Sequence, residues 1–139
     1  MSETGEMSTT DEIAAFYAAR LGEEEAAAKG MVAAFDGVAE WVIQENGGEF
    51  DFTVTAGQLA TEGVADAWRE DAASWIARHD PARALRKVRA GRKLILRYQV
   101  AMGVREEDHD PTVTALVGQM RDEATIWEDH PEYKELWRP

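Results

Sequence analysis

The clearest helix boundary in the sequence lies in the segment IARHDPARAL, residues 76–85. Asp80 is of a type that often caps a helix N-terminus, because its carboxylate accepts a hydrogen bond from a free backbone N–H of the first turn. Pro81 suits the first helical position, where its missing N–H is not needed. The segment therefore predicts that one helix ends at Arg78–His79 and that the next begins at Pro81.

The same signal recurs at Asp110-Pro111, and apolar residues at helical spacing mark four helices. We expect the helix that begins at Pro81 to run to about Met102 and to stop at Gly103. The expected apolar faces are Ile13, Phe16, Tyr17, Leu21, Ala28, Met31 and Phe35 in the first helix; Val64, Trp68, Ala72, Trp75 and Ile76 in the second, which starts at about Glu62; Ala84, Leu85, Val88, Ile95, Tyr98 and Met102 in the third; and Val113, Leu116, Val117, Met120, Ala124 and Trp127 in the fourth.

The two ends of the chain carry weaker signals. Residues 1–8 are polar and are expected to be a disordered lead. Thr9 and Glu12 have the spacing of a capping box, which predicts the start of the first helix. Near the other end we expect Leu136 and Trp137 to pack against the body, because burying such side chains removes apolar surface from water.

Residues 36–56 allow two interpretations. Apolar residues at 38–43 would continue the first helix to a stop at 46–47. Alternatively, residues 41–43 and the alternating segment 50–54 flank Asn-Gly-Gly and would pair as a hairpin. We favour the hairpin.

The composition is that of one globular domain. The chain has 139 residues, of which 45% are hydrophobic and 30% charged. Cysteine is absent, which excludes disulfides, thiolate metal sites and a cysteine nucleophile and fits a reducing compartment. The start shows no signal peptide, and no apolar stretch reaches the roughly 18–20 residues of a membrane span. We expect a mainly α protein of about four helices, with a short β-hairpin between the first and second. Residues 9–139 would form a single cytoplasmic domain without membrane contact.

The charge is distributed unevenly. The formal net charge is −12, yet residues 78–105 contain nine basic residues and one acid, a net charge of +8 against −20 for the remainder. On the predicted third helix, five of these cations lie opposite the apolar face. They are the candidate interaction surface: Arg83, Arg86, Lys87, Lys93 and Arg97.

The three histidines, His79, His109 and His130, all lie beside a proline-containing turn. Three imidazoles could bind a metal ion, which makes a metal-dependent hydrolase one alternative. No two of them have the four-residue spacing that places two ligands on one helix face. Local roles beside the caps Asp80 and Asp110 are therefore favoured, and we expect no metal or other cofactor.

Other catalytic patterns are weak. Ser74 lies inside a predicted helix without the G-x-S-x-G elbow of a serine nucleophile. Gly47-Gly48 precedes a predicted strand and not a helix, so it is no phosphate loop. We assign no catalytic residue.

Two segments carry a resemblance. IARHDPARAL, residues 76–85, and DHPEYKELWRP, residues 129–139, resemble the hallmarks of an uncharacterised family of small proteins from actinobacteria and their phages. The resemblance implies a small cytoplasmic protein and supplies no activity. It also implies cysteines between the hallmarks in many relatives, suggestive of metal, and this chain has none there.

These observations favour a non-enzymatic interaction or regulatory protein that contacts a protein partner, or itself, through the basic helix. The first alternative is a nucleic-acid-binding accessory protein, because a row of cations can follow phosphates. Against it, the remaining charge of −20 repels nucleic acid, and no aromatic residue on the stripe could stack with bases. The second alternative is the metal-dependent hydrolase.

Overall fold

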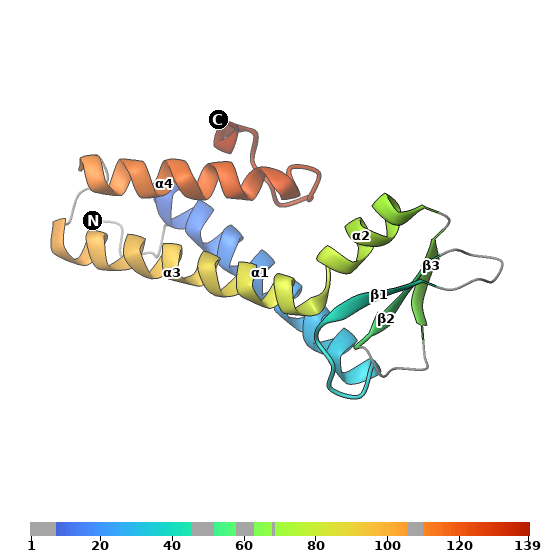
Figure 1. Cartoon of the computed structure of the whole chain (residues 1–139). Coiled ribbons are helices and arrows are strands. Elements are labelled where there is room, and N and C mark those ends of the chain that lie inside the picture. The colour runs from blue at the N-terminus through green and yellow to red at the C-terminus, as the bar shows by residue number, and fades with distance from the viewer. Residues whose placement is uncertain (1–7, 46–51, 58–62, 68, 106–109) are drawn as a thin grey trace. The chain divides into compact units, whose positions relative to one another are not determined.

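The computed structural model describes residues 8–45, 52–57, 63–67, 69–105 and 110–139 (Figure 1). Within these ranges the chain forms four α-helices, a three-stranded sheet between the first and second helix, and two short 3₁₀ helices. The expectation of a mainly α protein with a minor β element is confirmed. None of the described helices combines the length and apolar character needed to cross a membrane. The expected disordered lead, apart from Ser8, falls outside the described residues.

The contacts within the chain divide it into two compact units. The first comprises Met1–Glu23 and Arg89–Pro139, and the second comprises Glu24–Val88. The helices α1 (Thr9–Ala34) and α3 (Pro81–Arg105) contribute residues to both. The single domain expected from the sequence stays a prediction.

The second unit contains an antiparallel sheet in the order β1-β2-β3. Its strands are β1 (Trp41–Glu45), β2 (Phe52–Ala56) and β3 (Gly63–Ala67). Ile43 lies opposite Val54 in the β1–β2 pair, which confirms the hairpin interpretation of residues 36–56. Figure 1 shows α2 (Glu70–Arg78) beside this sheet, and α2 contacts all three strands.

Strand β3 contradicts the predicted helix start at about Glu62. Val64 and its neighbours pair with β2, with a register shift between Val54 and Thr55, and α2 begins only at Glu70. Small residues dominate β3, so its own propensity is weak and pairing with β2 decides its conformation. The core beneath α2 is formed by Val54, Ala67 and Ala73, with Trp41, Ile43, Phe52, Val64, Ile76 and Ala77 packed against it.

The first unit is helical. It contains the start of α1, most of α3, α4 (Pro111–Ala124) and the 3₁₀ helices η1 (Thr125–Trp127) and η2 (Glu135–Trp137). A Cβ atom on Gly91 would lie 2.7 Å from Leu21 Cδ1 and 2.7 Å from Tyr17 Oη, so glycine permits a close approach of α1 and α3. The buried residues of this unit are Ile13, Ala14, Phe16, Tyr17, Arg20, Leu21, Leu94, Ile95, Tyr98, Val113, Val117, Met120, Ala124 and Trp137, together with Gly91.

Both predicted aspartate caps are confirmed. Asp80 Oδ1 accepts a hydrogen bond of 2.9 Å from the Arg83 N–H, and α3 begins at Pro81. Asp110 accepts one of 2.8 Å from the Thr112 N–H at the start of α4. Each carboxylate satisfies a backbone donor that has no partner inside its helix.

Other local predictions are wrong. Ser8, and not Thr9, caps α1, because its hydroxyl accepts the Asp11 N–H at 3.1 Å. Gly103 does not end α3, which continues to Arg105, since one glycine costs a helix only about 1 kcal/mol. Leu136 is 56% exposed, whereas Trp137 is buried as expected. Three residues assigned to apolar faces are exposed: Met31, Ala72 and Trp75.

Candidate functional site

The five cations of the candidate interaction surface are all exposed on α3. Arg83, Arg86 and Lys87 belong to the second unit, and Lys93 and Arg97 to the first. Within the described residues, no ion pair involves any of them. Basic side chains elsewhere do have carboxylate partners: Arg20, Lys29, Arg69, Lys134 and Arg138. The helix α3 therefore presents charge that the described fold does not neutralise.

An exposed apolar row accompanies the cations in the first unit. Leu96, Val100 and Val104 are 58%, 58% and 72% exposed, and their four-residue spacing places them on one side of α3. By helical periodicity Lys93 and Arg97 lie on the same side. We call these five residues the basic–apolar face. Aliphatic side chains left in water beside unpaired cations are typical of a surface that binds a partner.

A second feature, the arginine pocket, lies in the second unit. It has a volume of about 620 Å³ and is formed where β1, α2 and the start of α3 meet. Its lining residues are Trp41 and Ile43 of β1, Ser74, Ala77 and Arg78 of α2, the cap Asp80, and Arg83 and Arg86 of α3.

The cap Asp80 links two elements that line the arginine pocket, α3 and β1. Its Oδ1 atom caps α3, and its Oδ2 atom accepts a hydrogen bond of 3.1 Å from the Trp41 N–H at the start of β1. The Ala82 N–H also donates to the Ala39 carbonyl at 3.0 Å. These bonds fix the first turn of α3 against the chain that enters the sheet.

Polar groups in the arginine pocket are poorly matched. Arg78 Nε donates to the Ser74 carbonyl at 3.4 Å, and no carboxylate pairs with Arg78, Arg83 or Arg86 within the described chain. The Trp41 indole Nε1 is buried and has no hydrogen-bond acceptor among the described residues. Three arginines thus line a cavity whose one carboxylate, that of Asp80, already accepts two backbone donors.

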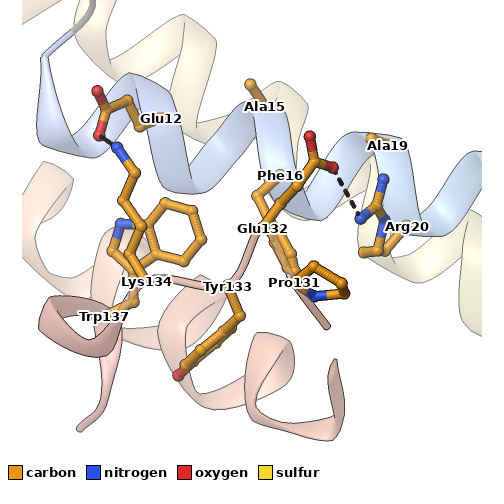
Figure 2. Close-up of a pocket in the computed structure, with 10 residues that line it drawn as sticks. All are labelled: Glu12, Ala15, Phe16, Ala19, Arg20, Pro131, Glu132, Tyr133, Lys134 and Trp137. Carbon is orange, nitrogen blue, oxygen red and sulfur yellow. Dashed lines mark hydrogen bonds and ion pairs between the residues drawn. The ribbon is translucent and has the colours of Figure 1, made fainter. Parts of the chain in front are cut away.

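A third feature, the tail groove, lies in the first unit and is shown in Figure 2. Its volume is about 550 Å³, and the C-terminal segment faces one side of α1 across it. The lining residues are Glu12, Ala15, Phe16, Ala19 and Arg20 of α1, and Pro131, Glu132, Tyr133, Lys134 and Trp137 of the tail.

Aromatic contacts attach the tail to α1. The Phe16 ring centroid lies 5.5 Å from that of His130, 5.8 Å from that of Tyr133 and 5.1 Å from that of Trp137. Such pairs add to the free energy gained by burial. Trp137 is 2% exposed, so it anchors the tail as the sequence predicted.

The cations of the tail groove are paired, unlike those of the arginine pocket. Arg20, 6% exposed, lies 3.3 Å from Glu132 and 3.1 Å from Glu23, and its Nη1 atom contacts both ring nitrogens of His130. Lys134 Nζ lies 2.7 Å from Glu12 Oε2, an interaction drawn in Figure 2. The charges of this groove therefore stabilise the tail and leave no cation free for a ligand.

Tyr17 of α1 is buried, with its ring centroid 5.9 Å from that of Trp127. Burial, with a smaller contribution from the negative charge of Glu123, raises the pKa of the Tyr17 phenol to about 12.

Each of the two described histidines has partners within its own unit. His79, in the second unit, stacks on Trp75 with ring centroids 4.0 Å apart, and its Nδ1 donates to the Trp75 carbonyl at 2.7 Å. His130, in the first unit, accepts the Glu132 N–H at Nδ1. His109 lies outside the described residues. Among the described histidine and carboxylate side chains, no group of three is placed to bind a metal ion.

Sequence reasoning missed the arginine pocket. The sequence offers Ser74 as a weak nucleophile candidate, and residue 41 as part of a strand or of a continued first helix. One signal was present, since Arg78 precedes the helix break and Arg83 and Arg86 follow it within two turns. The contribution of β1 had no local signal, because it depends on pairing between distant segments.

The chain belongs to a family of unknown function, DUF6221, whose model matches residues 10–139. No curated protein matches the sequence, and no solved structure matches it either.

Proposed function

We propose that this member of a family of unknown function is a non-enzymatic interaction protein, and that its basic–apolar face binds an acidic amphipathic segment of a partner protein. The observation that carries the proposal is the exposed row Leu96, Val100 and Val104 beside Lys93 and Arg97, which form no ion pair within the part of the chain that the structure describes. The sequence-based surface also includes Arg83, Arg86 and Lys87, which belong to the second unit and are not part of the basic–apolar face.

The chemistry of the face specifies the partner. An amphipathic helix buries apolar side chains in steps of three and four residues, which fits the four-residue spacing of the row. Acidic residues beside that apolar stripe would meet Lys93 and Arg97. Complementary charge of this kind raises association rates and selects the partner.

A second copy of the chain fits this face less well. A two-fold symmetric contact would set this face against its own copy, and none of its five residues is acidic, so Lys93 and Arg97 would find no opposite charge in it. We therefore favour a different, acidic protein.

The resemblance of the two hallmark segments supports an actinobacterial or phage origin as part of this proposal. A cytoplasmic setting, expected from a chain without cysteine, belongs to it as well.

The test is binding of a labelled synthetic helix with a leucine stripe flanked by glutamates, measured by fluorescence anisotropy at physiological salt. We expect saturable binding that weakens at least tenfold in the variant Lys93→Glu/Arg97→Glu and in Val100→Asp. The charge-matched control is Lys29→Glu/Arg69→Glu, which adds the same negative charge at exposed positions and should leave binding unchanged.

Three results would contradict the proposal. Equal loss in the control would show that only net charge matters. Dimerisation abolished by Val100→Asp would assign the face to a second copy of the chain. Micromolar binding of labelled duplex or single-stranded DNA at physiological salt, abolished by Lys93→Glu/Arg97→Glu, would favour the nucleic-acid function.

A further inference from the structure

We propose that the arginine pocket binds the phosphate group of a phosphomonoester. This inference goes beyond the protein-binding face, because Arg78, Trp41 and Ser74 belong only to the pocket. It depends on the geometry of the second unit alone.

The charge of the pocket fits a dianion. Arg78, Arg83 and Arg86 bring three positive charges, and Asp80 brings one negative charge, so the lining carries a net charge of +2. A phosphomonoester carries a charge between −1.5 and −2 at pH 7, because its second pKa is about 6. Guanidinium groups bind phosphate through paired N–H donors, which makes arginine the usual residue for this ligand.

An anion would also offset the electrostatic repulsion among the side chains of the arginine pocket. Like charges that line one cavity repel each other, and no carboxylate in the described chain pairs with the three arginines. The Asp80 oxygens are engaged by the backbone N–H groups of Arg83 and Trp41. A phosphate oxygen would supply the charge that the fold itself does not provide.

Other groups extend the fit beyond charge. Trp41 and Ser74 line the same cavity, and the buried Trp41 Nε1–H has no acceptor among the described residues, so a ligand oxygen would supply one if the indole turned toward it. Ile43 and Ala77 give the pocket an apolar side, where the organic part of the ester would lie. A volume of about 620 Å³ is that of a small-molecule site.

The test is titration of the full chain with inorganic phosphate, with glycerol phosphate and with a phosphoserine peptide. Affinity is measured by calorimetry at constant ionic strength. The ¹⁵N-labelled protein reports the indole N–H resonance of Trp41, which Trp41→Phe identifies. We expect saturable binding, a shift of that resonance, and weaker binding at pH 5, where the ligand becomes a monoanion. The preferred organic ligand tells whether the phosphate comes from a small molecule or from a modified protein.

Matched variants decide whether the pocket is responsible. Arg78→Gln removes a pocket donor and should weaken phosphate binding at least tenfold. Lys87→Gln removes one exposed charge from α3 outside the pocket and should change the affinity less than twofold. Arg78 is exposed, so its variant should fold, which circular dichroism checks. Binding of the acidic helix should be unaffected by Arg78→Gln, so each proposal can fail alone.

Two outcomes would overturn the inference. One is the absence of saturable binding by any of the three ligands at millimolar concentration. The other is an equal loss of affinity in Arg78→Gln and Lys87→Gln, which would show that phosphate responds to the general charge of α3 and not to the pocket.

Discussion

The tail groove and the arginine pocket are cavities of similar size, yet they treat positive charge in opposite ways. In the groove, Arg20 lies against two glutamates and Lys134 against Glu12. In the pocket, three arginines line the cavity with a single carboxylate, that of Asp80, which accepts backbone donors and pairs with none of them within the described chain. Paired charge therefore stabilises the groove, and the arginines of the pocket have no such role within the described fold.

The largest effect should come from the aromatic anchor of the groove. Trp137→Ala removes a side chain that is 2% exposed and packed on Phe16, and such truncations cost about 3–5 kcal/mol of unfolding free energy. Leu136→Ala, at a position 56% exposed, should cost less than about 0.5 kcal/mol. Urea denaturation measures both. Equal, small losses would mean that the tail does not stabilise the first unit.

Arginine removal tests the comparison directly. Arg20→Gln should lower the free energy of unfolding by about 1.5–3 kcal/mol, the range for hydrogen bonds to charged groups, because Arg20 is buried and paired. In phosphate-free buffer, Arg86→Gln should change it by no more than about 0.5 kcal/mol, or raise it by relieving repulsion. Similar losses of unfolding free energy in Arg20→Gln and Arg86→Gln would show that the two cavities do not differ in how their arginines affect stability.

The cap Asp80 should give the next effect. Asp80→Ala removes a helix cap, which costs about 0.5–2 kcal/mol, and we expect the upper end because Trp41 also loses its acceptor. Asp80→Asn keeps one acceptor oxygen and should therefore lie between wild type and Asp80→Ala. Thermal unfolding in phosphate-free buffer measures the series. If Asp80→Asn lowers the stability as much as Asp80→Ala does, the lost negative charge matters more than the lost capping hydrogen bond.

The variant Tyr17→Phe should have the smallest effect on the free energy of unfolding at neutral pH. A measurable effect is expected only in alkali. Its pKa of about 12 in the folded state exceeds the ordinary value of 10.0, so folding favours the protonated phenol. The stability that this shift contributes is fully present below about pH 10 and is lost as the pH rises through 12. Tyr17→Phe should flatten the alkaline fall in unfolding free energy. An unchanged fall would assign it to other groups.

Local chemistry made part of this fold predictable. Asp80-Pro81 and Asp110-Pro111 each hold the information for a helix start within a few residues, and both predictions were right. At Gly103 a local stop signal was overridden, because the following turn of α3 still forms.

Non-local packing accounts for what was missed. Strand β3 is specified by β2, and the tail groove joins Arg20 to Glu132 across most of the chain. The basic residues of α3 were recognised from composition. Their division into a partner-binding face and a pocket depends on β1 and on side-chain exposure, which no short segment encodes.

Each oxygen of the Asp80 carboxylate accepts a different backbone N–H, and this affects how the surrounding segments unfold locally. One side chain holds the amide protons of both Trp41 and Arg83, so strand β1 and the first turn of α3 cannot loosen independently without breaking one of its bonds. Segments coupled in this way open as one cooperative unit, and their amides exchange with deuterated solvent through a common free energy of opening. A ligand bound by Arg83 and Arg86 would slow that exchange in the strand as well as in the helix. Slower amide exchange at the start of strand β1 would therefore show that a ligand is bound at a site formed largely by helical residues.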